Sequence, residues 1–308
     1  MIKIGVQSSS WFDEKDPQTS LRFYKECGFD AIDYNIDAHL RPGVLAKQET
    51  EEYTSLFDKT VEELFVYYTP LKEAIAETGV TVSQMHAPFY VWMPGKDKLN
   101  DYVMMAIKKC VAVCHFLGCP ALVVHPTLRD REWDEYEFNL NIYRQLIPDA
   151  QKYGVKICLE NIFSRHGSRM IEGRLSDAAV AARMIDALNQ EAGMDAFGFC
   201  FDIGHAILTR KNIRAFIRTL GHRLTILHIH DNDGNEDLHM IPCTYLQNGS
   251  THIADWDGLV EGLRDIGYRG TLAFEVFRIY TAFPKSVHKE ALRLVSAIGR
   301  EWAKRLEE

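Results

Sequence analysis

The sequence predicts an α/β protein folded as a (β/α)8 TIM barrel, and three observations support this. Eight short apolar segments typical of buried strands alternate with eight longer helical segments along the 308 residues. No linker or low-complexity stretch interrupts the alternation. Six of the eight strands end in acidic or His side chains, at the end where such barrels carry their chemistry. We therefore expect a single TIM-barrel domain over residues 1–308, with residues 39–59 forming a lid or excursion after the second strand.

The first half of the chain establishes this alternation. Strands are predicted at residues 3–8, 31–37, 82–87 and 121–125. Helices are predicted at residues 17–27, 61–78, 100–117 and 135–153. Pro17 opens the first helix, and a glycine follows each of the four, at Gly28, Gly79, Gly118 and Gly154. Proline at the start and glycine just past the end are typical helix boundaries.

The second half repeats the pattern. Strands are predicted at residues 156–162, 197–202 and 271–276, together with an apolar run from Leu224 that continues through His230. Helices are predicted at residues 177–188, 214–220, 255–266 and 285–306. The polar segment between residues 163 and 176 is expected to be a loop. Eight strand and helix pairs in succession are the number that closes a parallel barrel.

The most informative stretch is ILHIHDNDGNEDLH, at residues 226–239. His228 and His230 stand two residues apart in an apolar strand, so both imidazoles point to the same face. Either residue alone would be expected to be a hydrogen-bonded core histidine. The polar residues that follow make a binding site the better interpretation. They are Asp231, Asn232, Asp233, Asp237 and His239.

Ionisable residues also mark the ends of the other strands. Each one alone could form a salt bridge or cap a turn, but ionisable groups rarely gather at the ends of buried strands without pairing or coordination. The sequence therefore predicts that one mouth of the barrel is lined with acid/base and metal-binding groups. The residues are His86, His125, Glu160, Asp202 with His205, His228 with His230, and Glu275.

These motifs resemble the sugar phosphate isomerase/epimerase family, which has the xylose isomerase-like TIM barrel. The resemblance covers essentially the whole chain and is specific for the superfamily, but not for a substrate. The chain departs from the family in the segment 241–249, which implies a longer loop over the site. The motifs are HAP at His86, VVHP at His125, LEN at Glu160, FDIGH at Asp202, HIHDNDG and DLH at His228 to His239, and FEV at Glu275.

The resemblance implies one divalent metal ion, Mn, Mg, Co or Zn, bound by Glu160, Asp202, His228 and Glu275. His228 is chosen over His230 because the family places the ligand three residues before an Asp, here Asp231. The implied reaction is isomerisation or epimerisation of a sugar, sugar phosphate or related hydroxy-ketone through an enediolate. Glu160 and Glu275 would be the catalytic acid/base pair.

Further residues are candidates for binding the substrate. The resemblance implies this role for His205, and the strand ends suggest it for His86, His125, His230 and His239. Trp92, with Phe89 and Trp11, would offer an apolar wall to a sugar ring, although plain packing explains these aromatic residues equally well. Arg165, with Arg169 and Arg174, would hold a phosphate or carboxylate. The alternative for these arginines is a solvated, salt-bridged loop.

Two other functions remain open. The first is a metal-dependent phosphodiesterase resembling the apurinic endonucleases of the endonuclease IV type, which bind three zinc ions. A net charge of −8, from 35 basic and 43 acidic residues, disfavours nucleic acid as a partner. The second is a metal-stabilised binding protein. For the first alternative, the candidate zinc ligands are His86, His125, Glu160, Asp202, His205, His228, Asp237, His239 and Glu275.

Composition indicates a soluble protein of the cytoplasm. The seven cysteines show no CxxC pair, which indicates reduced thiols. The chain begins directly with a strand, and no apolar stretch is long enough to cross a membrane. The expected partner is a small carbohydrate, and a homo-oligomer is compatible with the sequence.

Overall fold

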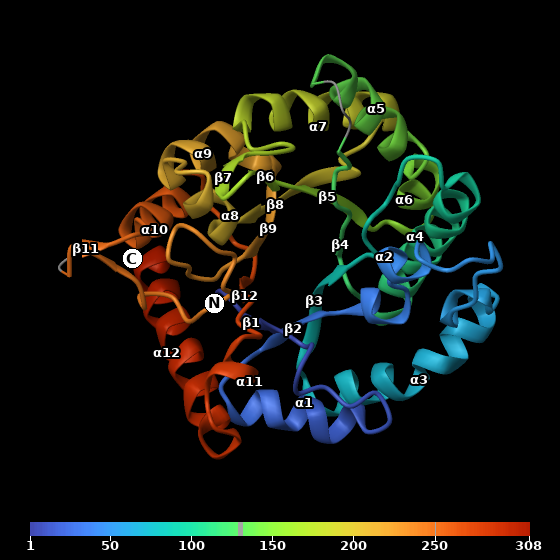
Figure 1. The fold of residues 1–308 in the computed structure, drawn as a ribbon. Helices are drawn as coiled ribbons and strands as arrows, with labels where there is room; N and C mark the ends of the chain where they lie inside the picture. Colours follow the sequence, from blue (N-terminus) through green and yellow to red (C-terminus); the bar gives the residue numbers. More distant parts are fainter. Residues whose placement is uncertain (129–131, 250) are drawn as a thin grey trace.

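The structure is a computed structural model that describes residues 1–128, 132–249 and 251–308. A sheet of eight parallel strands curls into a barrel, and helices surround it (Figure 1). The fold is therefore the predicted (β/α)8 barrel. Its strands are β1 (Ile4–Gln7), β2 (Ala31–Tyr34), β3 (Thr81–His86), β4 (Ala121–Val123), β5 (Lys156–Glu160), β8 (Phe197–Asp202), β9 (Leu224–His228) and β12 (Leu272–Phe274).

The barrel closes between β9 and β12, the two edge strands of the sheet. The strand order is β12-β1-β2-β3-β4-β5-β8-β9. Beyond the end of β9, Ile229 forms a parallel bridge with Phe274. The Ile229 amide donates to the Ala273 carbonyl at 2.9 Å, and its carbonyl accepts from the Glu275 amide at 3.0 Å. The hydrogen bonds that close the barrel thus lie directly beside His228 and Glu275.

The outer ring of helices follows the predicted boundaries closely. The helix α3 coincides with its prediction: a Thr60/Glu63 capping box begins it, and Gly79 ends it with φ 72°. Most of the large apolar side chains are buried between this ring and the strands. The helices are α1 (Pro17–Glu26), α3 (Val61–Thr78), α4 (Asp97–Leu117), α5 (Glu132–Arg144), α6 (Ile147–Tyr153), α7 (Ala178–Ala192), α9 (Ile213–Leu220), α10 (Trp256–Asp265) and α12 (His288–Glu307).

Two local predictions were wrong, and one short helix was missed. The single helix expected at residues 135–153 is divided into α5 and α6, because Pro148 lacks an amide hydrogen and its ring would clash with the Arg144 carbonyl. The expected loop at residues 163–176 contains an antiparallel hairpin, β6 (Phe163–His166) with β7 (Arg169–Glu172). A short helix that was not predicted, α8 (Ile203–Leu208), follows β8.

Only part of the expected lid, residues 39–59, forms helical structure. They include parts of η1 (Ile36–His39) and all of α2 (Pro42–Leu45) and η2 (Leu56–Asp58). Lys109 of α4 donates to the carbonyls of Phe57 and Lys59 at 2.7 and 2.8 Å, which fastens the end of this segment to the helical ring.

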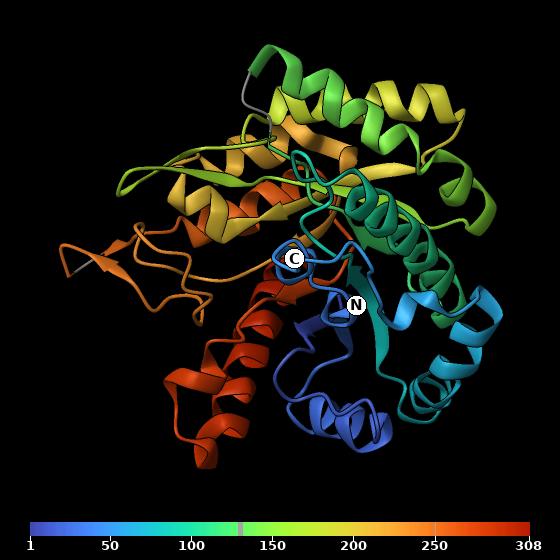
Figure 2. The same ribbon diagram turned by 45° about the vertical axis from the view of Figure 1, so that its right-hand side comes forward.

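The long connection after β9 carries a second small hairpin. Its strands, β10 (Leu246–Gln247) and β11 (Thr251–His252), pair antiparallel and project from the barrel (Figure 2). This hairpin overlaps the segment 241–249, where the resemblance implied a longer loop. Within the described residues, none of the helices combines the length and apolar character needed to cross a bilayer.

The terminal helix α12 seals the barrel where its first and last strands meet. A Cβ added at Gly299 would lie 2.8 Å from Phe274 Cε2 and 2.9 Å from Ile4 Cγ2. Both distances are shorter than a carbon contact allows. Glycine at this position lets the helix lie close against β1 and β12.

We expect Gly299→Val to destabilise the fold by about 1–3 kcal/mol, because the new methyl groups overpack this contact. Ala297→Val is the matched control, since Ala297 is exposed on the same helix and its change should stay within about 0.5 kcal/mol. Urea unfolding of the two variants measures the difference. Equal stabilities would contradict the proposed packing.

Candidate metal centre

Alternation along three adjacent strands directs the central site residues into the barrel. Small and apolar side chains of β4, β5, β8 and β9 form a buried cluster there, separate from the main core. Cys158, Cys200 and Ile226 belong to this cluster, and each stands two residues before a site residue. Because strand side chains repeat every two residues, Glu160, Asp202 and His228 point to the same interior.

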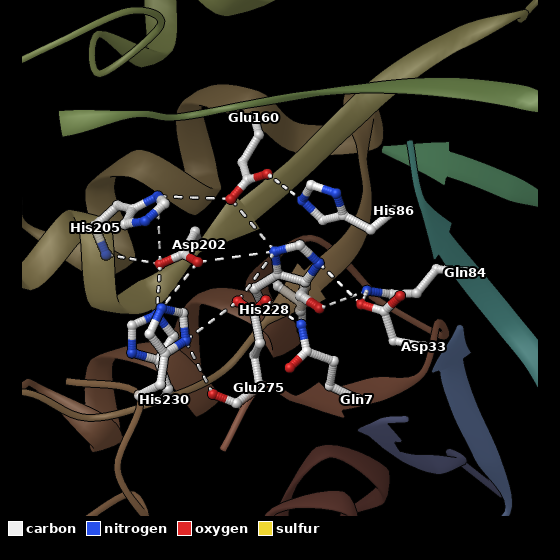
Figure 3. Close-up of polar contacts among 12 residues, drawn as sticks. Gln7, Asp33, Gln84, His86, Glu160, Asp202, His205, His228, His230 and Glu275 are labelled. Atoms are coloured by element: carbon white, nitrogen blue, oxygen red, sulfur yellow. Dashed lines mark hydrogen bonds and ion pairs between the residues drawn. The ribbon is translucent and has the colours of Figure 1, made fainter. Parts of the chain in front are cut away.

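His228 lies at the centre of the site (Figure 3). Its Nδ1 is 3.3 Å from Glu160 Oε1, 3.6 Å from Glu275 Oε2 and 3.8 Å from Asp202 Oδ2. His228 is 1% exposed, so almost no water reaches this group. The three carboxylates implied by the resemblance thus lie within 3.8 Å of one buried imidazole nitrogen, although the four residues belong to or follow four different strands.

A second set of polar residues surrounds Asp202. Its Oδ1 accepts the His205 amide at 2.7 Å, which caps α8, and lies 3.2 Å from His230 Nε2. The side chain of Asn161 holds the Asp202 backbone through two hydrogen bonds of 2.8 Å. A Cβ at Gly204 would overlap the His230 ring, so glycine is required there.

His239 and Asp237 extend the site on the side of Glu275. His239 Nε2 lies 3.0 Å from Asp237 Oδ2, and its Nδ1 lies 3.5 Å from Glu275 Oε2. The His239 ring stacks on the His230 ring with centroids 3.9 Å apart. Asp237 Oδ2 is also 3.7 Å from His205 Nε2. The DLH motif therefore belongs to the same cluster as the histidines of β9 and α8.

His86 and His125 occupy the side of Glu160 that faces β3 and β4. His125 Nε2 lies 2.9 Å from Glu160 Oε2 and 2.9 Å from His86 Nε2. Phe89 covers both rings, with centroids 4.8 Å from His125 and 5.2 Å from His86. The rings of these three residues thus line one side of the polar centre.

Two of the predicted substrate-binding residues lie in other surroundings. Trp92 packs edge-to-face against Phe138 at 4.9 Å, and its carbonyl accepts from Thr127 at 3.2 Å. Arg165 lies on the β6–β7 hairpin, where its half-exposed guanidinium pairs with Glu236 at 2.9 Å. The structure thus places Arg165 in the salt-bridged loop that was its alternative interpretation.

Opposite charges stabilise one another in the centre. Burial would raise the pKa of Glu160, but the imidazoles of His125 and His228 outweigh it and hold that pKa well below the usual range. Burial would lower the pKa of His205, but Asp202 and Asp237 raise it to about 10. Without metal, protonated imidazoles neutralise the buried carboxylates.

The donor set fits a divalent cation. Three buried carboxylates and one imidazole are a mixed oxygen and nitrogen set suited to Mn, Mg, Co or Zn. Asp202, His228 and Glu275 have ligand atoms close enough together to hold a cation, and so do four other groups of described residues: His86 with His125 and Glu160, Glu160 with Cys200 and His228, Asp202 with His205 and His230, and His230 with His239 and Glu275. A metal ion would supply the positive charge that the imidazolium groups supply without it.

Three buried polar residues next to the centre were not predicted. Asp33, Gln84 and Gln7 lie on β2, β3 and β1, and they contact His228 or Glu275 directly or through one another. The signal that could have revealed them is a charged or amide side chain inside a short apolar strand, as in AIDY and TVSQMH. Alternation shows that such a residue is buried, but not what it contacts.

Comparison with known proteins places the chain in a family. The model of the xylose isomerase-like TIM barrel family matches residues 21–298. The chain belongs to this family. An uncharacterized protein of Methanocaldococcus jannaschii is 27% identical over 224 residues, which cover 69% of this chain and 70% of that protein.

Solved structures show the same fold. A 3-keto-D-glucoside 4-epimerase from Escherichia coli superposes with a TM-score of 0.68 and 18% identity, covering 96% of this chain and 100% of that one. A D-tagatose 3-epimerase-like protein superposes with a TM-score of 0.65 and 20% identity, covering 99% and 98%. At these identities the likeness concerns the fold.

The stabilisation of the protein by Mn²⁺ should grow as pH rises from about 6.5 toward about 10. The raised pKa of His205 makes its protonated form contribute stability that is complete below the unfolded pKa of about 6.5 and lost as pH rises through about 10. Bound Mn²⁺ would replace that positive charge. Thermal unfolding of metal-free and Mn²⁺-saturated protein across this range measures the difference.

Buried thiols also reduce stability above about pH 8.5. They do so equally in the metal-free and the Mn²⁺-saturated protein, so their effect cancels when the two stabilities are subtracted. His205→Gln should flatten the pH dependence of the metal-free protein. A metal stabilisation that is constant with pH, or shrinks as pH rises, would contradict this account of the charges.

Proposed function

We propose that the protein is a divalent-metal-dependent isomerase or epimerase acting on a sugar, sugar phosphate or related hydroxy-ketone. The observation that carries the proposal is the buried Nδ1 of His228, which faces Glu160, Asp202 and Glu275 within 3.8 Å. Structural likeness to a 3-keto-D-glucoside 4-epimerase and to a D-tagatose 3-epimerase-like protein supports the reaction class. Membership of the xylose isomerase-like family agrees with it.

Glu160, Asp202, His228 and Glu275 would hold the metal ion. A bound divalent ion would polarise a substrate carbonyl and lower the pKa of the adjacent carbon acid. The burial of these ligands, each less than 10% exposed, keeps the surroundings dry and strengthens every charge interaction.

Glu160 and Glu275 would move the proton. They approach His228 from different sides of the centre, so a substrate bound between them would have a carboxylate near each face (Figure 3). The depressed pKa of Glu160 keeps this residue ionised at neutral pH. Positioned proton transfer contributes about 10²- to 10⁴-fold to a rate.

The five other histidines of the mouth would contact substrate hydroxyl groups. They are His86, His125, His205, His230 and His239, and each lies within 4 Å of a carboxylate of the centre. Trp92 and Arg165 remain proposals for the outer part of the site. We infer a small carbohydrate as the ligand rather than nucleic acid, because the net charge is −8.

We also propose a cytoplasmic location. All seven cysteines are free, and six are buried, as expected where thiols stay reduced. A homo-oligomer remains compatible with this proposal.

Phosphodiester hydrolysis is the second candidate. The observation that favours it is the set of additional ligand groups around His125, His205 and His239, which could bind more than one metal ion. Two or three ions a few ångströms apart are typical of enzymes that cleave phosphodiesters. The acidic net charge of the chain counts against a DNA substrate.

Metal content distinguishes the two candidates. We expect close to one equivalent of divalent metal in the purified protein, and no nicking of a plasmid that carries abasic sites. His228→Ala should lose the metal, whereas His230→Ala should largely keep it. Elemental analysis and gel electrophoresis provide the measurements. Two to three tightly held zinc ions together with nicking would favour the endonuclease.

Solvent isotope exchange tests the proton transfer. Turnover of an accepted ketose in D₂O should place deuterium at the reacting carbon, because the carboxyl proton exchanges with solvent. Glu160→Gln and Glu275→Gln preserve shape but remove the base, so exchange at saturating metal should collapse in at least one variant. Mass spectrometry of the product measures the exchange.

Metal content must be measured in both variants, since each change also weakens the metal site. If both variants with metal bound retained turnover, neither glutamate would be the acid/base group. Product formed without deuterium would indicate a shielded proton transfer or a hydride shift between adjacent carbons.

A further inference from the structure

Three strands on one side of the barrel carry buried polar side chains that the proposed ligand set does not include. Gln7 of β1, Asp33 of β2 and Gln84 of β3 are 5%, 1% and 0% exposed. Burying a carboxylate and two amides is costly unless each has a specific partner. Asp33 lies beside His228, Gln7 beside Glu275, and Gln84 beside Asp33 (Figure 3).

Asp33 contacts the nitrogen of His228 that faces away from the other carboxylates. Its Oδ2 lies 3.1 Å from His228 Nε2. A neutral imidazole has one N–H group and one bare nitrogen. When Nε2–H donates to Asp33, the bare nitrogen is Nδ1, the atom that faces Glu160 and Glu275. Asp33 therefore favours the tautomer of His228 in which Nδ1 can bind a cation.

Gln84 fixes the position of Asp33. Its Nε2 donates to the same Asp33 oxygen at 3.0 Å and to the Leu227 carbonyl at 3.2 Å. Leu227 immediately precedes His228, so Gln84 connects Asp33 to the strand that carries the ligand. Neither Asp33 nor His228 can turn without losing a buried hydrogen bond, which costs about 1–3 kcal/mol.

Gln7 acts on Glu275 in the same way. Its Nε2 donates to Glu275 Oε1 at 2.6 Å. The other oxygen, Oε2, lies 3.6 Å from His228 Nδ1 and 3.5 Å from His239 Nδ1. Gln7 thus occupies one carboxylate oxygen and leaves the other directed into the centre.

We propose that Asp33, Gln84 and Gln7 are positioning residues that hold His228 and Glu275 ready to bind a divalent cation. The proposal rests on the proposed function, because it assumes that this centre binds metal. Strands β1, β2 and β3 would orient two ligands, His228 of β9 and Glu275 directly after β12. Partners of this kind that orient a metal ligand typically raise metal affinity 10- to 100-fold.

The alternative is that the three residues only stabilise the barrel. The two roles differ in what a substitution changes. A purely structural role alters the unfolding of the metal-free protein and leaves the affinity of the folded protein for metal unchanged. A positioning role lowers that affinity even in variants that unfold like the original protein.

The test is Mn²⁺ binding, measured by calorimetry on the folded protein, in a set of variants. Asp33→Ala removes the acceptor, so affinity should fall about 10- to 100-fold. Asp33→Asn retains an oxygen acceptor without charge and should cause a smaller loss. Gln7→Met should also weaken binding, because Glu275 is then free to rotate. Thermal unfolding without metal is measured in parallel.

Asp30→Asn is the matched control, because it makes the same change at the residue that immediately precedes β2. Asp30 accepts the Ile4 amide and an Arg300 N–H, both at 2.8 Å, and it does not belong to the described metal-ligand groups. This variant should be destabilised while its Mn²⁺ affinity remains that of the original protein.

A spectroscopic measurement reports on the tautomer directly. In Zn²⁺-loaded protein, ¹⁵N NMR should show a solvent-protected Nε2–H on His228, and Asp33→Ala should accelerate its exchange. Unchanged Mn²⁺ affinity in the Asp33 and Gln7 variants would overturn the positioning role alone. If the unaltered protein bound no metal, the metal centre of the proposed function would fail, and this proposal with it.

Discussion

The structure depends on one buried imidazole enclosed by carboxylates. His228 has Asp33 at one nitrogen and Glu160, Asp202 and Glu275 around the other, with little access to water. Negative groups repel one another strongly where solvent cannot screen them. Such a cluster persists only if positive charge is present among the carboxylates. Protonated imidazoles supply that charge without metal, and the site chemistry favours a divalent cation in their place.

The barrel holds this cluster of charged side chains in place because they come from several different strands. The closing bridge at Ile229 lies between His228 and Glu275, so the hydrogen bonds that complete the barrel also fix the two residues relative to each other. Below them, small and apolar side chains such as Cys158 and Cys200 fill the interior. The same contacts therefore stabilise the barrel and fix the geometry of the site, so a substitution that disturbs them should change both.

The two candidate functions use the same centre and differ in what surrounds it. One metal ion held by four ligands suits an isomerase, whereas the additional His and Asp groups could complete a larger metal cluster. The fold is compatible with either chemistry, because a barrel of this kind supports many reactions by changes in its loops. The hairpins after β5 and β9 are two such loops.

The sequence alone determined the barrel and the residues at its mouth. Short apolar strands, glycine helix ends and strand-terminal His, Asp and Glu residues are local signals, and the structure contains each of them. Pro148, which divides a predicted helix, was a local signal too, but its effect was not predicted.

Only the tertiary structure decided the partners of each residue. Arg165 pairs with Glu236 and Asp33 contacts His228, across 71 and 195 residues of sequence. His228 and His230 share a face, so alternation could not separate them. In the barrel one meets Glu160 and Glu275, while the other lies against Asp202 and His239. The spacing of side chains along a strand fixes which way they point, but closure of the barrel fixes what they meet.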